Sequence, residues 1–288
     1  MYELRYEEPA TLDAAIGLIT AEAGDVRILA GGTDVLVQMH SDLIEPALLV
    51  NIKNIAEMRT IEKENGGYRF GAAVSSMEMV NHADFAQEWP GVMDGVKLIG
   101  SIQIKGRATV AGNVCNASPA ADSVPPMMTA GAVATVVGAS GRREVPVGEI
   151  ATGPGQTSLD KGEIVVSFTL PERPPRSGDA YLRFTPRTEM DIAVVAAAVN
   201  LTLDDGGTCT DAKVALGAVA EKVLMVEAAA AALIGTKLDA AAMENLAAAA
   251  SAACRPIDDK RGTKEYRIKV AGVLARRAAG IALQRAGA

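Results

Sequence analysis

The spacing of apolar residues predicts a helix and then a series of short strands in the N-terminal part of the chain. From Leu12 to Ile19 the apolar residues recur at helical spacing, with Thr11 as a suitable N-cap and Gly24 as a suitable end. Runs rich in β-branched and aromatic residues follow, and they predict strands at VRIL (26–29), ALLVNI (47–52) and YRFGAAV (68–74).

Helical and strand patterns also alternate through the middle of the chain. Residues 76–100 predict one or two helices that are broken at Pro90 and Gly91. Two apolar runs, AVATVVGAS (132–140) and EIVVSFTLP (163–171), predict further strands.

The composition changes near residue 177. The nine residues PERPPRSGD (171–179) include three prolines and a glycine, which is typical of a linker or a long turn. Beyond them we expect a pair of strands around the turn at Asp205–Gly206, followed by alanine-rich helices at 220–234, 240–254 and about 263–285. The pattern therefore predicts an α+β chain with a domain boundary near residue 177.

Charge and cysteine content narrow the class of protein. The 288 residues carry a formal net charge of −7, which disfavours a nucleic-acid partner. No apolar run reaches the ~18 residues of a membrane span, and the acidic N-terminus does not resemble a signal peptide. Three scattered cysteines and two histidines supply neither a four-thiolate cluster nor a zinc site, so we expect a cytoplasmic chain without a metal of its own.

A double glycine follows the first of the predicted strands. In LAGGTDVL (29–36), Gly31 and Gly32 tolerate positive φ and leave main-chain N–H groups open, which suits an anion such as a pyrophosphate. The stretch is not a GxGxxG that leads into a helix, so a Rossmann fold is not supported. Taken alone, a double glycine is more often an ordinary tight turn.

A second stretch of small residues, TVAGNVCNASPAADS (109–123), contains little that could fill a core. Thr109, Gly112 and Asn113 combine a hydroxyl, a bare backbone and an amide within five residues, and Asp122 is suited to receive ribose or ribityl hydroxyls. The alternative interpretation is an N-cap box ahead of a helix, and the stretch alone does not decide between them.

Three segments together resemble the signature segments of a known family. AGGTDVLVQM (30–39), IGSIQIKGRATVAGNVCNASPAADSVPPMMTAGA (99–132) and RFTPRTEMDIAVVAAAV (183–199) look like those of the FAD-binding medium subunit of molybdenum hydroxylases, the xanthine dehydrogenase and carbon monoxide dehydrogenase family. The resemblance implies a vanillyl-alcohol-oxidase-type (PCMH-type) FAD-binding domain over 1–176, with subdomains of about 1–55 and 56–176. A small C-terminal domain of sheet and helices, like that of the CO dehydrogenase flavoprotein, would follow over 177–288.

The resemblance also assigns contacts to a non-covalently bound FAD and no catalytic residue. The first glycine stretch would wrap the pyrophosphate and the second would form the opposite wall, while Asp122, Arg183 and Ile192 match positions near the flavin. The full set is Leu29, Ala30, Gly31, Gly32, Thr33, Asp34, Val35, Leu36, Ile99, Thr109, Ala111, Gly112, Asn113, Ser118, Asp122, Ile164, Val165, Arg183 and Ile192.

Two departures from the family pattern concern the cofactor site. Position 111 is Ala where many relatives have Gly, which narrows the room around the phosphates. Position 33 is Thr where carbon monoxide dehydrogenases usually have His, and Ile192 replaces their Tyr. The differences at positions 33 and 192 weaken an assignment to carbon monoxide oxidation.

The resemblance implies that this chain is one of three kinds of subunit. A large subunit would hold the molybdopterin cofactor, and a small subunit would hold two [2Fe–2S] clusters that pass electrons to this FAD. The flavin would then reduce an external acceptor, and the assembly would be a dimer of heterotrimers. Neither the substrate nor the acceptor is encoded in this chain.

Two other functions have weaker support. A stand-alone flavin oxidase of the same superfamily often attaches FAD through a His or Cys, but neither His40 nor Cys115 matches the usual attachment point, and no substrate-binding cap is evident. A scaffold that kept only the fold would not need the intact glycines of both stretches.

Overall fold

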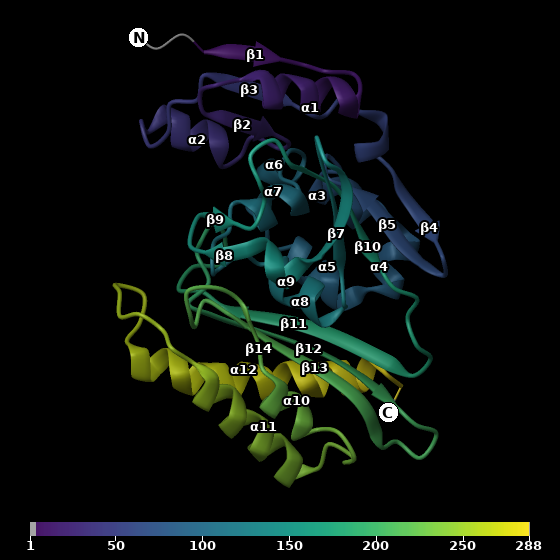
Figure 1. Ribbon diagram of the computed structural model, residues 1–288. Coiled ribbons are helices and arrows are strands. Elements are labelled where there is room, and N and C mark those ends of the chain that lie inside the picture. Colours follow the sequence, from purple (N-terminus) through teal and green to yellow (C-terminus); the bar gives the residue numbers. More distant parts are fainter. Residues whose placement is uncertain (1–3, 288) are drawn as a thin grey trace.

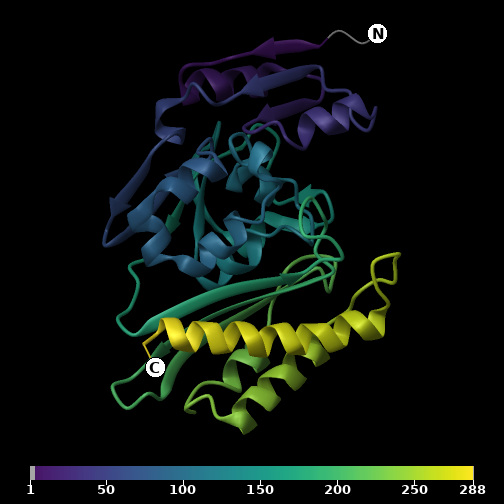
Figure 2. The ribbon, with the colours of Figure 1, turned by 180° about the vertical axis from the view of Figure 1, so that it is seen from behind.

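The structure is a computed structural model that describes residues 4–287, and it places three main β-sheets in succession along the molecule (Figure 1). A parallel three-stranded sheet forms the N-terminal end, and an antiparallel five-stranded sheet lies in the middle. An antiparallel four-stranded sheet follows, and the long C-terminal helices cover its outer face (Figure 2). The predicted α+β class is therefore confirmed.

The strands of the N-terminal sheet run parallel because helices connect them. The first helix begins after Thr11, whose hydroxyl accepts a hydrogen bond from Ala14 N at 3.2 Å, and it buries the apolar face predicted from the sequence. It ends at Ala21, before Gly24. The elements are β1 (Arg5–Glu7), α1 (Leu12–Ala21), β2 (Val26–Leu29), α2 (Val35–His40) and β3 (Leu48–Asn51).

An aromatic cluster fills the core of the middle sheet. Phe70 and Phe168 face each other in register with 5.4 Å between ring centroids, and Phe85 packs edge-on against Phe70 at 5.8 Å. All three rings are buried, so they stabilise the sheet by burial and by ring contacts. The strands are β4 (Ile61–Glu64), β5 (Gly67–Gly71), β6 (Val133–Gly138), β7 (Gly141–Pro146) and β10 (Ile164–Leu170), with a separate pair, β8 (Ala151–Gly153) and β9 (Gln156–Thr157).

Short helices surround the middle sheet, and the predicted break at Pro90 is confirmed. One helix ends at Glu88, and Pro90 opens the next at its first position, where a proline loses no hydrogen bond. An earlier break lies at His82, whose Nδ1 accepts a hydrogen bond from Phe85 N at 3.3 Å. The helices are η1 (Ala56–Met58), α3 (Ser76–Asn81), α4 (Ala83–Glu88), α5 (Pro90–Val96), α6 (Ile102–Lys105), α7 (Val110–Cys115), α8 (Val124–Thr129) and α9 (Val147–Ile150).

The segment predicted as a linker ends inside a strand. The first strand of the C-terminal sheet begins at Ser177, and Asp179 on it is buried. This carboxylate accepts hydrogen bonds from Arg173 Nη1 at 2.8 Å and from Val92 N at 3.2 Å, which fixes the strand to α5. The predicted hairpin at Asp205–Gly206 is confirmed. The strands are β11 (Ser177–Phe184), β12 (Val195–Leu203), β13 (Cys209–Gly217) and β14 (Leu224–Met225).

One of the three predicted C-terminal helices is wrong. Residues 220–234 form β14 and a short helix instead of one helix, because Leu224 pairs with Leu216 at the edge of the sheet. Alanine content favours a helix locally, but pairing with an existing strand outweighs that preference. The helices are α10 (Glu227–Ala231), α11 (Ala240–Ala253) and α12 (Lys264–Arg285).

Small residues allow α12 to lie close against the sheet. Most of its buried side chains are alanines, and it crosses β11 and β12 (Figure 2). A side chain at Gly178 on β11 would clash with the carbonyl oxygen of Ala282. None of the helices in the described part of the chain is both long and apolar enough to cross a membrane.

Candidate functional site

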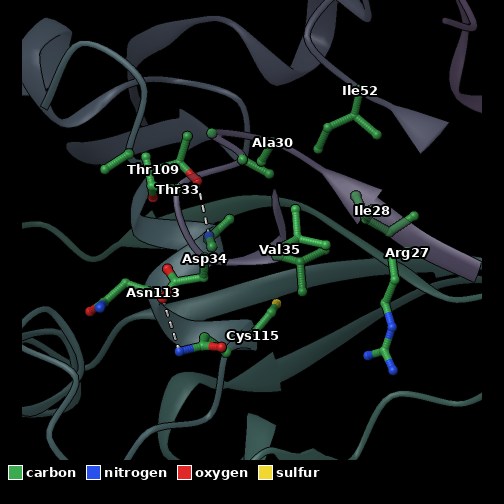
Figure 3. Close-up of a pocket in the computed structure, with 18 of the residues that line it drawn as sticks. Arg27, Ile28, Ala30, Thr33, Asp34, Val35, Ile52, Thr109, Asn113 and Cys115 are labelled. Atoms are coloured by element: carbon green, nitrogen blue, oxygen red, sulfur yellow. Dashed lines mark hydrogen bonds between the residues drawn. The ribbon is translucent and has the colours of Figure 1, made fainter. Parts of the chain in front are cut away.

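A cavity of about 260 Å³ lies where the N-terminal sheet meets the middle of the molecule. Both small-residue stretches line it, although they are far apart in the sequence and belong to different units of the fold. Figure 3 shows Thr33 and Asp34 of the first stretch beside Thr109 of the second. The predicted site residues that line the cavity are Ala30, Gly31, Gly32, Thr33, Asp34, Val35, Ile99, Thr109, Ala111, Gly112, Asn113, Ile164 and Val165.

The first glycine stretch is a tight loop between β2 and α2. Gly32 has φ +80°, which strains any residue with a Cβ. A Cβ at Gly31 would clash with the carbonyl oxygen of Arg107 and lie 2.8 Å from the carbonyl carbon. Across the described residues, no main-chain carbonyl accepts a hydrogen bond from the N–H groups of residues 31–34. These N–H groups, on residues that line the cavity, are thus available to an anion.

The second stretch forms the opposite wall of the cavity, and hydrogen bonds at Thr109 and at the preceding residue hold it in place. The hydroxyl of Thr109 caps α7 by accepting a hydrogen bond from Gly112 N at 2.9 Å. The preceding residue, Ala108, accepts a hydrogen bond from Ser76 N at 2.7 Å, and its other side faces Gly31. Thr109 therefore caps the helix inside the stretch, whereas Ser123, at the N-cap of the following α8, makes no side-chain cap hydrogen bond. The contact of Asp122 with sugar hydroxyls stays a prediction.

Part of the cavity lining is apolar. Ile28 of β2 and Ile52 after β3 lie together in Figure 3, and Ile99, Ile164 and Val165 also line the cavity. A wall of branched aliphatic side chains suits a flat ring system that is inserted between them. The cavity is thus lined both by N–H groups without a main-chain partner and by branched aliphatic side chains.

Several lining residues were not predicted from the sequence. β2 contributes Val26, Arg27 and Ile28 because it leads directly into the glycine loop, and no local motif marks these residues. Asn116 follows the predicted Asn113 by three residues, so helical spacing could have suggested it. The lining residues that were missed are Val26, Arg27, Ile28, Gln38, Ile52, Ala72, Ala108, Cys115, Asn116, Leu159 and Glu163.

The cysteine in the cavity has no features of a reactive thiol. Burial raises the pKa of Cys115 to about 12, so the thiol stays protonated. Among the described residues, no group of three or more His, Cys, Asp or Glu side chains is placed to hold a metal ion.

Some of the predicted site residues do not line this cavity. Leu29 is buried under the loop beside Gly32, and Leu36 is half exposed on α2. Ser118 accepts a hydrogen bond from Ala120 N at 3.2 Å, and Ile192 is 53% exposed in the connection between β11 and β12. The other two residues that lie outside the cavity are Asp122 and Arg183.

Asp122 and Arg183 are paired with each other. Arg183 Nη1 donates to Asp122 Oδ2 at 2.5 Å, and the Tyr181 hydroxyl donates to Oδ1 at 2.7 Å. Burial raises the pKa of Asp122 to about 6, against the opposing effects of Arg183 and Tyr181. Because Ser123 donates to the cavity-lining Asn113 at 2.7 Å, this group adjoins the cavity wall.

Comparison with known families divides the chain into two matched regions. Residues 2–173 match the family described as the FAD binding domain in molybdopterin dehydrogenase. Residues 180–282 match the CO dehydrogenase flavoprotein C-terminal domain.

Curated relatives match over nearly their whole length. The carbon monoxide dehydrogenase medium chain of Afipia carboxidovorans is 34% identical over 273 residues, which cover 95% of this chain and 94% of the relative. The xanthine dehydrogenase FAD-binding subunit of Escherichia coli O157:H7 is 30% identical over 284 residues, which cover 98% and 97%.

Solved structures agree in fold over the same extent. A chain of the cyanide-inactivated Cu,Mo-CO dehydrogenase superposes with a TM-score of 0.94 at 33% identity, covering 99% of both chains. A chain of quinoline 2-oxidoreductase from Pseudomonas putida 86 gives a TM-score of 0.91 at 27% identity, covering 99% of this chain and 98% of that one. The chain therefore belongs to the family of FAD-binding oxidoreductase subunits shared by the carbon monoxide and xanthine dehydrogenases.

Proposed function

We propose that the cavity holds part of a non-covalently bound FAD, with the pyrophosphate against the free N–H groups of residues 31–34 and one flat ring against the aliphatic side chains of the lining. These donors suit a pyrophosphate because neutral main-chain amides donate hydrogen bonds to an anion and carry no charge of their own. The bound flavin would supply the redox chemistry, and this chain would bind, orient and shield it.

The residues outside the cavity have proposed roles at the flavin end of the same cofactor. Asp122 and Arg183 form a nearly neutral, buried pair between the helix-rich middle unit and β11. Ile192 lies on the connection that follows β11. An extended dinucleotide exceeds a cavity of about 260 Å³, so its remaining part needs contacts such as these.

The electron path proposed for this chain runs through subunits. Relatives carry the names medium chain and FAD-binding subunit, and this chain spans 94% and 97% of two of them. We propose that a small subunit with two [2Fe–2S] clusters delivers electrons from a large molybdopterin subunit, that FAD passes them to an external acceptor, and that two heterotrimers associate. Three free cysteines suit a reducing cytoplasm.

The proposed domain division follows the sheets. A boundary between 176 and 177 is supported by the start of β11 at Ser177 and by matched regions that end at 173 and begin at 180. Subdomains of about 1–55 and 56–176 separate β3, which ends at Asn51, from β4, which begins at Ile61.

The test compares the isolated chain with the chain expressed together with its genomic neighbours. Native mass measurement reports which polypeptides co-purify. Carbon monoxide, xanthine and nicotinate, after which relatives are named, are then added anaerobically while flavin absorbance is recorded. We expect one medium, one large and one small subunit per unit, with the flavin bleached only in that assembly.

The opposite result identifies the alternative function. An isolated chain that purifies alone and reduces its own FAD with an organic substrate at a catalytic rate is a stand-alone oxidase. A chain that binds no FAD in either preparation contradicts both functions.

A further inference from the structure

Three polar side chains form a bridge between the two walls of the cavity. Gln38 Nε2 donates to Asn116 Oδ1 at 3.1 Å, and Asn116 Nδ2 lies 3.5 Å from Asp34 Oδ1. Asp34 is the N-cap of α2, and Gln38 lies one turn later on the same side of this helix. The amide of Asn116, at the end of α7, therefore contacts both. All three residues line the cavity.

The carboxylate of Asp34 determines which group donates and which accepts in each hydrogen bond of the bridge. A carboxylate only accepts hydrogen bonds, so Asn116 must present its NH₂ group to Asp34 and its oxygen to Gln38. Gln38 must in turn present its own NH₂ group. Partial desolvation raises the pKa of Asp34, although the residue as a whole is exposed.

The bridge joins parts of the chain that the sheets do not join. Its two contacts span 78 and 82 residues, from the N-terminal unit to the middle unit. A second close approach of the loop to the opposite wall is that of Gly31 to Arg107 and Ala108, just before the second stretch. Two separate points of contact fix both the distance and the angle between two walls.

From this geometry we propose that Asn116 is a positioning residue, which holds the loop at residues 31–34 against α7 through Asp34 and Gln38 and so sets the width of the pyrophosphate site. The inference rests on the proposed FAD function. Asn116 acts through the loop and α2, and it does not need to contact the cofactor.

The test measures the Kd of FAD by quenching of flavin fluorescence, and the free energy of unfolding of the FAD-free chain, for four variants. Asn116→Asp keeps the size of the side chain but places a carboxylate against Asp34. Asn54→Asp adds the same charge at an exposed position with no hydrogen bond in the structure, and it is the matched control. The double variant Asp34→Asn/Asn116→Asp restores a donor and an acceptor with exchanged positions, and Asp34→Asn alone completes the cycle.

We expect Asn116→Asp to weaken FAD binding about tenfold or more, because the donor to Asp34 is lost and two carboxylates then face each other, although Gln38 can still donate to residue 116. Asn54→Asp should leave the Kd within about twofold of the wild type. The double variant should recover to within about threefold of the wild type. That recovery distinguishes positioning by the bridge from a general loss of structure.

Two results would overturn the inference. One is an Asn116→Asp variant that binds FAD as tightly as Asn54→Asp. The other is a double variant no better than Asn116→Asp, with the unfolding free energy of both unchanged. A wild-type chain that does not bind FAD contradicts the proposed function itself, so the two failures are distinguishable.

Discussion

Replacing Gly31 by alanine tests whether the close approach of the two loops controls cofactor binding. The added methyl group would clash with the carbonyl oxygen of Arg107 and lie 2.8 Å and 3.0 Å from Arg107 C and Ala108 Cα. All three atoms are backbone, so no rotamer change relieves the overlap. Ala108 is also held by Ser76, which prevents the second wall from moving away freely.

The size of the effect follows from overpacking. Forcing an extra methyl group into a packed contact typically costs about 1–3 kcal/mol. If the loops come together only when FAD binds, the whole cost falls on binding, and the Kd rises about 5- to 150-fold. If they are already apposed without FAD, the same cost lowers the free energy of unfolding instead.

The assay therefore measures both quantities, by FAD titration and by urea unfolding of the FAD-free chain. Gly106→Ala is the matched control, because no heavy atom lies within 4 Å of its added Cβ and its φ is not positive. The loss in FAD-binding free energy and the loss in unfolding free energy are added for each variant. Their sum should be at least about 1 kcal/mol larger for Gly31→Ala than for Gly106→Ala. Equal values for both variants would refute the argument from close approach.

Three further predictions concern charge and covalent attachment. Arg183→Met should lower the free energy of unfolding by about 3–5 kcal/mol near pH 7, since it leaves Asp122 buried without a cation, and the loss should shrink near pH 5; an equal loss at both pH values would contradict this. Because the pKa of Asp122 is about 6 when folded and 3.8 ordinarily, its contribution to stability is full below about pH 4 and lost as the pH rises through 6. Urea unfolding across that range should show less pH dependence in Asp122→Asn than in the wild type. Acid precipitation should release FAD from both the wild type and Cys115→Ala, and flavin retained in the wild-type pellet would show a covalent bond.

Local patterns predicted most elements of the fold but not how the elements meet. The helix after Thr11 and the strands at 26–29 and 164–170 have clear periodicity and capping residues, so short-range rules suffice. The helix expected at 220–234 failed because Leu224 and Met225 pair with β13, only 8 and 10 positions earlier, and the alanine-rich composition does not reveal that pairing.

The site could be predicted where motifs are continuous. Gly31 and Gly32 looked equivalent in the sequence, yet one is required by a neighbouring backbone and the other by its φ of +80°. Asp122 and Arg183 were assigned separately to the cofactor, and their mutual bond across 61 residues is a tertiary property that neither motif reveals. The same is true of the bridge through Asn116.

A cavity whose walls come from two units of the chain makes the cofactor a ligand of the native state alone. Unfolding or parting of the units destroys the site, so free FAD at 100 times its Kd would add about 2.7 kcal/mol to stability. Flavin supply in the cell would then govern how often newly made chains open and are degraded by proteases. The abundance of this subunit, and with it the number of complete assemblies, would follow the availability of riboflavin-derived cofactor even at constant gene expression.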